Sequence, residues 1–413
     1  MKVLVPNDWD SDNNIIKVIG VGGGGCNAVN YMFNKGITGC SFIVCNTDRQ
    51  ALRECDVPVK IQMGAGLGAG TDPKAGQKAA LGCIDEISEK VFDGKTEIVF
   101  ITAGMGGGTG TGAAPVIANL AKERGILTVA VVTIPYKSEG PDAMGRALDG
   151  IHELERNVDS LLIINNEKLF EYFGDEFLHE AFPKSDEVLA TAVKGIIEII
   201  MRRGYINVDI QDVKKMMHNS GMALMGHGEG HGPNRLQDAV KGAFESPLLN
   251  DFDLKTSKNF LINVTVPNTD QGIHASEFEL INKMIQEQYT GNADRFKTGL
   301  IYDDSIGDGV LITAIATGFD MGKLSEIADI NLGNMIILKP DFTYKPTARK
   351  EDDLPDPLEG HRTIKIGYDR NDQRARFDYD PDNKPALVVE PGQDRSALES
   401  IPAIRRVSAD KIQ

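Results

Sequence analysis

Short apolar runs alternate with longer amphipathic stretches in the first part of the chain. Five of these runs are rich in β-branched side chains and hold few polar residues, as strands buried on both faces should. They cover residues 15–21, 41–46, 97–102, 127–134 and 161–165. Helical patterns lie between them, one of them over residues 113–124 with Gly125 in the position of a C-terminal cap. This order predicts an α/β fold with a Rossmann-like parallel sheet and helices on both faces.

A long helical pattern over residues 185–203 has few polar positions in its second half, which predicts a central helix buried on more than one side. Further strand and helix patterns predict a second, smaller α/β domain. They cover residues 260–266, 276–288, 299–302 and 310–317. Beyond residue 320 the chain is rich in proline, aspartate and charge, so it buries too little apolar surface to offset its ordering entropy.

These changes divide the chain into five expected parts. They are a first domain over residues 13–178, a central helix over 179–203, a second domain over 204–320, a flexible, disordered linker over 321–397 and a tail over 398–413. Apolar residues return in the tail at Ser400–Arg406. A partner-docking peptide and a tail without function both remain open there.

The charge balance limits the classes of partner. Against 44 Lys and Arg stand 60 Asp and Glu, a net charge of −16, which argues against a nucleic-acid partner. No apolar run approaches the roughly 20 residues of a spanning helix, and the N-terminus has no signal-peptide core. Five cysteines without a C-x-x-C pair indicate reduced thiols. We therefore expect a cytoplasmic protein that does not insert into a membrane.

Three glycine-rich turns carry the candidate chemistry. Gly20–Gly25 and Gly104–Gly112 each follow a strand and open a helix. A third turn, Gly66–Pro73, could close over a terminal phosphate, and a flexible loop is an equal alternative there. Glycine lets the backbone approach a phosphate, and a helix N-terminus offers free N–H groups to it. No Gly-Lys-Ser/Thr follows, so this is not a Walker loop, and backbone dipoles with Mg²⁺ must balance the phosphate charge.

The first turn also matches G-x-G-x-x-G, with Asp48 at the end of the second strand. A nicotinamide-dependent oxidoreductase is therefore one alternative. Hydride transfer has no use for a second phosphate cradle, however, so the turn at Gly104–Gly112 argues against it.

In this order the turns resemble the tubulin/FtsZ superfamily of GTPases, and the full set is similar to its bacterial cell-division members. The matching motifs are GGGGCN, CNTD, GAGTDP, GGGTGTGAAP, SEG, NN, NVDIQD and, in the tail, SIPAIRR. The resemblance covers roughly residues 13–320. It implies a GTP-binding first domain that holds GTP or GDP with Mg²⁺, and no protein ligand of the metal can be named from the sequence.

The resemblance also implies which residues bind the nucleotide. In the two helix-opening turns they are Gly22, Gly23, Gly24, Gly25, Cys26, Asn27, Gly107, Gly108, Thr109, Gly110 and Thr111. Asn46 and Asp48 would line the pocket, and Gly70 and Thr71 would lie near the γ-phosphate, with Asp72 beside them.

At the other end of the pocket, the resemblance places Glu139 on the ribose. Asn166 and Asp186 would read guanine, and Phe182 would stack on the base. Without the resemblance, a core aromatic at Phe182 and a helix N-terminal charge at Asp186 are the favoured interpretations.

One departure from the family lies at Ala143, where a basic residue is usual. We hypothesise that Arg146, one helical turn along, reaches back to replace it.

Asp209 and Asp212 are spaced so that both lie on one side of a helical turn, and on spacing alone an N-cap with an acidic first turn is the favoured explanation. The resemblance instead implies catalysis in trans, because the family presents this loop to the GTP of the next subunit. It implies a head-to-tail homopolymer at the midcell division ring. A GTP-binding filament protein with little turnover is the remaining alternative.

The same resemblance gives the tail a partner. Ile401, Pro402, Ile404 and Arg405 would dock on membrane-tethering division proteins.

Two further features invite interpretation. His227 and His231 lie in a glycine-rich stretch, which we expect to be a solvated loop rather than a metal site, because two ligands do not make a site. The neighbouring methionines are expected in the core. They are Met216, Met217, Met222 and Met225.

Overall fold

The computed structural model describes residues 14–167, 178–202, 205–206, 208–245, 254–291 and 293–319, with three short strands beyond them. For residues 178–183 only the backbone is described. The chain forms two compact units, Met1–Lys323 and Leu324–Gln413, and each is considered by itself.

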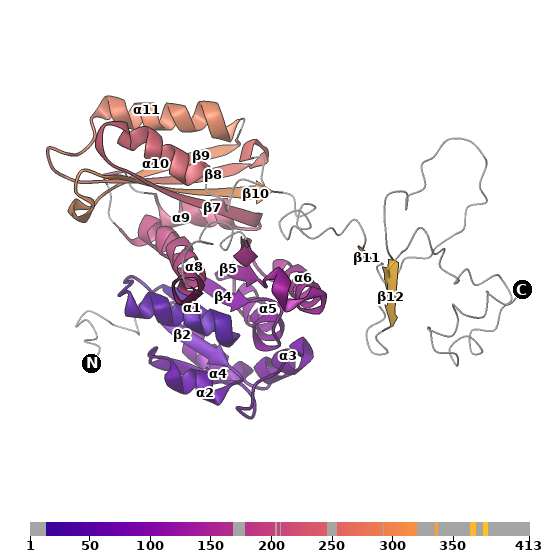
Figure 1. The fold of residues 1–413 in the computed structure, drawn as a ribbon. Helices are drawn as coiled ribbons and strands as arrows, with labels where there is room; N and C mark the ends of the chain where they lie inside the picture. Colours follow the sequence, from indigo (N-terminus) through magenta and orange to yellow (C-terminus); the bar gives the residue numbers. More distant parts are fainter. Residues whose placement is uncertain are drawn as a thin grey trace, which may run out of the picture. The chain divides into compact units, whose positions relative to one another are not determined.

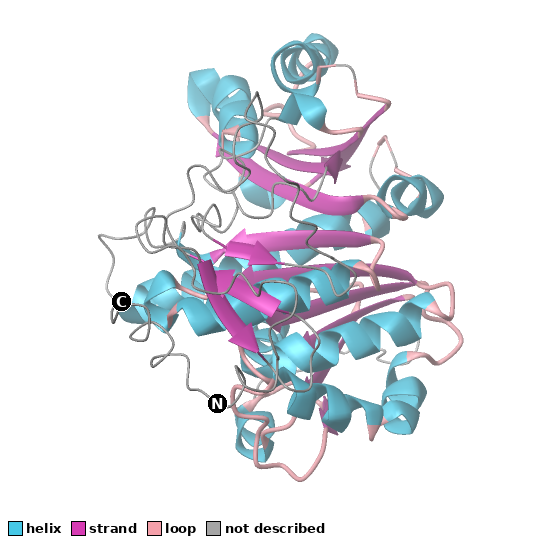
Figure 2. Cartoon of the chain, turned by 90° about the vertical axis from the view of Figure 1, so that its right-hand side faces the viewer, coloured by secondary structure: helices cyan, strands magenta, loops and turns pink. Residues whose placement is uncertain are grey.

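One ten-stranded sheet runs through the first unit, in the order β3-β2-β1-β4-β5-β6-β7-β10-β8-β9 (Figure 1). Its first six strands are β1 Ile16–Val21, β2 Ser41–Asn46, β3 Val59–Gln62, β4 Ile98–Gly104, β5 Leu127–Ile134 and β6 Ser160–Asn165. They pair in parallel, and helices cover both faces (Figure 2). The expected α/β fold with a Rossmann-like parallel sheet is confirmed, whereas β3 was missed because it is short and only half buried.

The strand order places a topological switch between β1 and β4, the point where ligands of such sheets bind at the carboxyl ends of the strands. The helices that follow these two strands begin there. They are α1 Gly22–Asn34 and α5 Thr109–Lys122. The other helices of this half are α2 Arg49–Glu54, α3 Pro73–Leu81, α4 Ile84–Val91 and α6 Pro141–Glu155.

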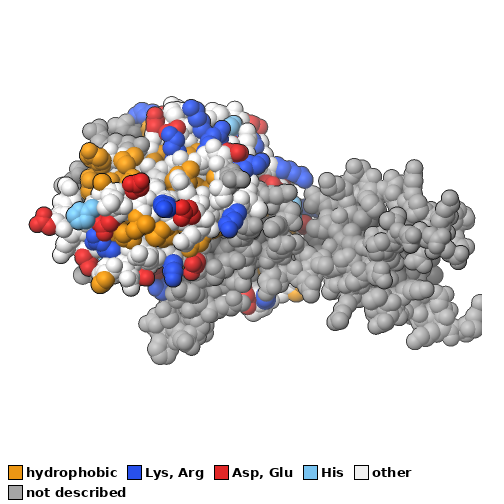
Figure 3. Space-filling model, turned by 90° about the horizontal axis from the view of Figure 1, so that it is seen from above, with side chains coloured by type: hydrophobic (Ala, Val, Ile, Leu, Met, Phe, Trp, Pro, Cys, Tyr) orange, Lys and Arg blue, Asp and Glu red, His pale blue; other side chains and the backbone are white. Residues whose placement is uncertain are grey.

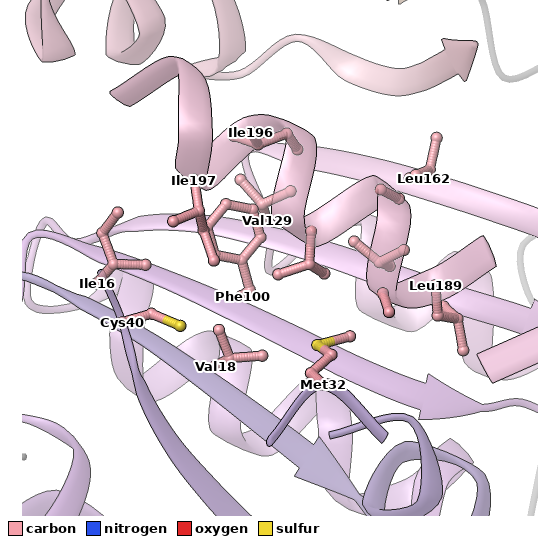
Figure 4. Close-up of a cluster of buried hydrophobic side chains, with 14 of the residues drawn as sticks. Ile16, Val18, Met32, Cys40, Phe100, Val129, Leu162, Leu189, Ile196 and Ile197 are labelled. Carbon is pink, nitrogen blue, oxygen red and sulfur yellow. The ribbon is translucent and has the colours of Figure 1, made fainter. Parts of the chain in front are cut away.

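The central helix, α8 Leu178–Met201, begins earlier than its pattern suggested. Its apolar face packs with α1 onto the sheet around Phe100, a ring with no exposed surface (Figure 4). Met32 of α1 and Leu189 and Ile196 of α8 contribute to the same cluster. The small number of polar positions in the second half of the helix follows from this burial.

Four strands continue the sheet beyond α8. They are β7 Gly221–Gly230, β8 Asn259–Val266, β9 Arg295–Tyr302 and β10 Val310–Phe319. Three helices accompany them, α9 Ile210–Met217, α10 Arg235–Phe244 and α11 Ala275–Ile285. Figure 3 looks onto the α10 and α11 side, where apolar side chains lie among charges. The join between the two halves is short, since β6 and β7 pair in parallel over three residues, Ser160–Leu162 with Gly221–Ala223.

The glycine-rich stretch around His227 and His231 is not a loop, so that prediction was wrong. It forms β7, in which a Cβ at Gly228 would lie 2.2 Å from the Ala239 carbonyl oxygen and one at Gly230 would lie 2.0 Å from that of Arg235. The glycines therefore let α10 lie directly on the strand.

The two histidines do not converge. The His227 Nδ1 atom is 3.2 Å from Thr313 Oγ1, while His231 contacts Asp308 and Glu229. Among the described residues, no group of three or more His, Cys, Asp or Glu side chains is placed to hold a metal ion. The four methionines are buried, which confirms the core assignment.

Part of the expected linker has regular structure. Three short strands, β11 Met335–Ile337, β12 Ile364–Tyr368 and β13 Ala375–Asp378, form an antiparallel sheet in the order β11-β13-β12. The rest of residues 321–397 lies outside the described residues, as do the tail and its Ile401, Pro402, Ile404 and Arg405. Within the described ranges, no helix is both long enough and apolar enough to cross a bilayer.

Removing the central ring of the core should destabilise the protein strongly. For Phe100→Ala we expect a loss of about 3–5 kcal/mol in the free energy of unfolding, because a buried cavity replaces the ring. Urea unfolding of the nucleotide-free protein, followed by circular dichroism, measures it. Leu67→Ala is the control, since Leu67 is 93% exposed and its loss should change stability by less than about 0.5 kcal/mol. Equal midpoints for the two variants would contradict the assignment of the core.

Candidate active site

The two helix-opening turns fit into each other at the switch point. A Cβ on Gly25 would lie 2.2 Å from the Thr102 carbonyl oxygen, and one on Gly22, whose φ is +73°, would lie 2.7 Å from the Gly110 nitrogen. No other residue fits at these two positions without moving the turns apart. The N-termini of α1 and α5 are thereby brought together, with the free N–H groups that a helix start provides.

Gly23 and Gly107 differ from Gly22 and Gly25 in having open space where a side chain would be. Both are exposed, and a Cβ on either would meet nothing within 4 Å. Packing inside the protein therefore gives no reason for glycine at these two positions. Bare backbone at the mouth of a loop is what close approach of an anionic ligand requires.

The third turn closes against the second. The Gly108 N–H donates to the Gly70 carbonyl at 3.1 Å, next to Thr71, and Asp72 caps α3 by accepting from the Lys74 N–H at 2.9 Å. The Thr47 and Thr109 hydroxyl oxygens are 2.6 Å apart. Thr47 was missed by the sequence analysis, because only the fold brings it to Thr109.

The polar side chains after β2 are engaged within the protein. Asn46 is buried, and its Oδ1 accepts from the Asp48 N–H at 3.1 Å. The Asp48 carboxylate caps α2 by accepting from the N–H groups of Gln50 and Ala51 at 2.8 and 3.3 Å. Burial raises the pKa of Cys26 to about 12, so the thiol is neutral, and it lies 3.7 Å from the Gly20 carbonyl oxygen within the turn.

Asn27 and Thr111 of the two turns differ in their exposure to solvent. Asn27 is exposed on α1. Thr111 is buried, and its hydroxyl oxygen accepts from the Gly106 N–H at 2.9 Å inside the loop. The Thr111 side chain therefore stabilises the conformation of the turn through a hydrogen bond on its buried side.

A second group of polar residues gathers where β5 and β6 end. Asn166 Oδ1 accepts from the Ser185 hydroxyl at 2.9 Å, which joins the end of β6 to α8. Burial raises the pKa of the neighbouring Asp186 from 3.8 to about 6. Glu139, in the 3₁₀ helix Lys137–Glu139, accepts from the Tyr136 N–H at 3.0 Å.

The Tyr136 hydroxyl lies close enough to the Glu139 and Asp186 carboxylates to interact with their charges. Its pKa is raised by burial and then by the nearby Glu139 and Asp186 carboxylates. Glu139, Asn166 and Asp186 thus lie at one end of the switch-point region. Phe182 belongs to α8, but its side chain is outside the described part of the structure.

Asp209 and Asp212 lie elsewhere. Asp209 is exposed and caps α9 by accepting from the Gln211 N–H at 3.1 Å, as the structural interpretation of the spacing predicted. Asp212 forms an ion pair with Lys297 of β9 at 3.2 Å.

The position of α9 is fixed by two contacts to the opposite edge of the sheet. Lys214 pairs at 2.8 Å with Glu97, which directly precedes β4, and His218 Nδ1 is 2.7 Å from Asp159 Oδ1, which precedes β6. The helix therefore sits at the amino ends of the parallel strands, whereas the glycine turns sit at their carboxyl ends.

The two edges are far apart. The seven residues of β4 span about 20 Å at the usual rise of a strand. Along α8, the fifteen steps from Asp186 to Met201 cover about 22 Å. The two acids of the α9 region are thus separated from the glycine turns of their own chain.

Two protein-family models match the chain, the GTPase domain of the Tubulin/FtsZ family over residues 15–174 and the C-terminal domain of the FtsZ family over residues 221–320. The cell division protein FtsZ of Porphyromonas gingivalis is 44% identical over 330 residues, which cover 78% of this chain and 71% of that protein. The chain belongs to the FtsZ family. FtsZ of Pseudomonas aeruginosa is 47% identical over 310 residues, 74% of this chain and 77% of that protein.

Solved structures agree with this FtsZ assignment. An empty FtsZ dimer from M. jannaschii matches with a TM-score of 0.67 and 40% identity, over 73% of this chain and 88% of that one. GDP-bound CetZ1 from Haloferax volcanii has a TM-score of 0.65 over 76% of this chain and 98% of that one, but with 18% identity it supports the fold alone.

As a member of the FtsZ family, the chain is a tubulin-like GTPase whose nucleotides are GTP and GDP. The nicotinamide alternative is therefore wrong. The first family model ends before α8, and the second begins after it.

The half-buried Asp186 carboxylate should lower the stability of the free protein at neutral pH. Because its pKa of about 6 lies above 3.8, the folded state holds the proton more tightly than the unfolded chain. This contribution to stability is complete below about pH 4 and is lost as the pH rises through about 6. Nucleotide-free Asp186→Asn should thus be more stable than the parent by about 1–3 kcal/mol at about pH 8, and equal to it near pH 4.

Thermal unfolding at the two pH values measures this difference. Asp238→Asn, at an exposed position in the first turn of α10, is the control; loss of a charge near the helix N-terminus should lower stability at about pH 8 by no more than about 1 kcal/mol, opposite in sign to the Asp186→Asn effect. A destabilised Asp186→Asn at about pH 8 would show that the carboxylate has partners in the free protein.

Proposed function

We propose that the chain polymerises head to tail and that Asp209 and Asp212 of one subunit promote hydrolysis of the GTP held by the next. The observation that carries this proposal is the position of α9 at the amino edge of the sheet, pinned by Lys214–Glu97 and His218–Asp159. A subunit with its acids on one edge and its nucleotide turns on the other needs a neighbour to complete the site.

The phosphates of GTP would lie on the backbone of the two helix-opening turns. The exposed, unobstructed Gly23 and Gly107 favour this placement, as do the free N–H groups and dipoles of α1 and α5. Thr109 and Gly70 would border the terminal phosphate, since the second and third turns contact each other there. Mg²⁺ carried on the phosphate oxygens would neutralise charge that no loop lysine offsets.

Guanine would lie at the Asp186 end of the pocket, with Asn166 beside it and Glu139 toward the ribose. A carboxylate can accept from both the N1–H and the exocyclic amine of guanine, whereas adenine offers no such pair of donors. The raised pKa of Asp186 supports this role, because a desolvated carboxylate gains most from new donors.

At the contact between subunits, Asp209 and Asp212 would polarise the attacking water and support the metal-bound phosphate. Asp209 is exposed and available to a neighbour. The ion pair with Lys297 would hold Asp212 in place until the contact forms.

Exposed apolar residues near both edges support a contact between copies. Leu67, in the third turn, is 93% exposed, and near the acidic loop Tyr205 and Tyr302 are 78% and 41% exposed with ring centroids 6.4 Å apart. Contacts between two different surfaces do not close on themselves, so they produce filaments.

We extend the proposal to the expected domain boundaries at 13–178, 179–203 and 204–320, and to the tail. The filament would assemble in the cytoplasm at the midcell division ring. There the tail peptide with Ile401 and Arg405 would bind membrane-tethering division proteins.

The base assignment makes a prediction about specificity. Asp186→Asn should lose GTP affinity by about tenfold or more and gain affinity for XTP, because the amide can accept from the xanthine N1–H and donate to its O2. Equilibrium titration of both nucleotides measures the switch. Parent-like preference for GTP over XTP would place the base elsewhere.

Catalysis in trans makes a prediction about mixtures. Asp212→Ala keeps the pocket but lacks an acid, and Asp186→Asn keeps the acids but takes up little GTP. Each alone should hydrolyse GTP at less than about a tenth of the parent rate, because each lacks one half of the site. An equimolar mixture should recover a substantial part of the rate, measured as phosphate release.

The control mixture contains Asp212→Ala and the double variant Asp186→Asn/Asp212→Ala, in which no subunit has the full acidic pair. It should stay inactive. No recovery in the first mixture, or a parent rate that is independent of protein concentration, would contradict the proposal. GTP-dependent light scattering without phosphate release would instead favour a filament protein with little turnover.

A further inference from the structure

Arg146 contacts the backbone of the protein, whereas the sequence suggested a direct contact to the nucleotide. Its Nε–H donates to the carbonyl oxygen of Gly106 at 2.8 Å, across from α6 to the second glycine turn. We propose that Arg146 is a positioning residue that turns the peptide group between Gly106 and Gly107 so that the Gly107 N–H faces the phosphates. The inference rests on the placement of the phosphates proposed above.

Peptide geometry connects the two ends of this group. In a trans peptide the C=O and the following N–H point in opposite directions, so a carbonyl held toward α6 turns the next N–H away from α6. Gly107 is exposed, with open space where its side chain would be. In the part of the chain that the structure describes, its N–H makes no hydrogen bond.

The preceding peptide group is fixed as well. The Gly106 N–H donates to the buried Thr111 hydroxyl at 2.9 Å, and Gly106 itself has a φ of +97°. Rotation of the backbone at Gly106 is thereby restricted from both sides, by Thr111 at the N–H and by Arg146 at the carbonyl. Without Arg146 one of these two restraints disappears.

Residue 143 also lies against this turn. A Cβ on Gly106 would lie 3.0 Å from the Ala143 carbonyl oxygen, so residue 143 and the turn are in direct contact. Ala143 itself is buried and carries no charge. Arg146 thus compensates through the backbone of the turn, in place of the direct phosphate contact that the sequence suggested.

Two substitutions separate a hydrogen-bond donor from a positive charge. Arg146→Gln keeps an N–H donor on the atom attached to Cδ, where Arg carries Nε, but has no charge. Arg146→Met reaches as far as the position of Nε, as glutamine does, and has no donor. Arg156→Gln, at an exposed position just after α6, removes the same charge away from the turn and serves as the control.

The measurement is the affinity of the full chain for GDP and, by competition, for guanosine. We expect Arg146→Gln and Arg156→Gln to bind GDP within about threefold of the parent, and Arg146→Met to bind it about tenfold or more weakly, the effect of one lost hydrogen bond to a charged group. Guanosine affinity should stay unchanged in all three, because the loss concerns the phosphates alone.

Three results would overturn the inference. Arg146→Gln as weak as Arg146→Met would show that the charge matters, and a parent-like Arg146→Met would show that the contact does not. An equal loss of guanosine affinity in Arg146→Met would indicate general damage to the pocket. Failure of the proposed function looks different, because it appears in the Asp186→Asn titration and in the mixing experiment, neither of which involves Arg146.

Discussion

Close backbone contact between two glycine turns is the constraint on which the rest of this structure depends. Gly25 meets the Thr102 carbonyl and Gly22 meets the Gly110 nitrogen at distances that leave no room for a side chain. Only this contact brings the starts of α1 and α5 to one point at the switch of the sheet. The sum of two helix dipoles and several free N–H groups at that point gives an acidic chain, with a net charge of −16, a place for an anion.

The polarity of a parallel sheet then determines where chemistry can take place. Turns after the strands gather at one edge and segments before the strands at the other, so the glycine turns and α9 cannot meet within one chain. Glu97 and Asp159, which precede their strands, hold Lys214 and His218 of α9 at the far edge. In this FtsZ-family GTPase, the separation is the structural basis of the proposal that one subunit completes the site of the next.

Two groups near the pocket are poorly arranged for the free protein. Asp186 is half-buried with no cation paired to its carboxylate among the described residues, and Gly107 offers an N–H without a partner there. Each of these features costs stability when the protein is empty and would become favourable when a ligand supplies the missing partner. Sites of this kind concentrate strain where binding can relieve it.

The sequence by itself determined the parallel strands, the two helix starts, the central helix and the family, because periodicity and glycine spacing are local properties of the chain. Only the tertiary structure decided the use of Arg146 for Gly106, the pairing of His218 with Asp159 and the strand at Gly228. In each case the deciding contact joins residues distant in sequence, or a helix backbone to a strand. Local propensity carries no record of such contacts, since they depend on which surfaces the folded sheet brings together.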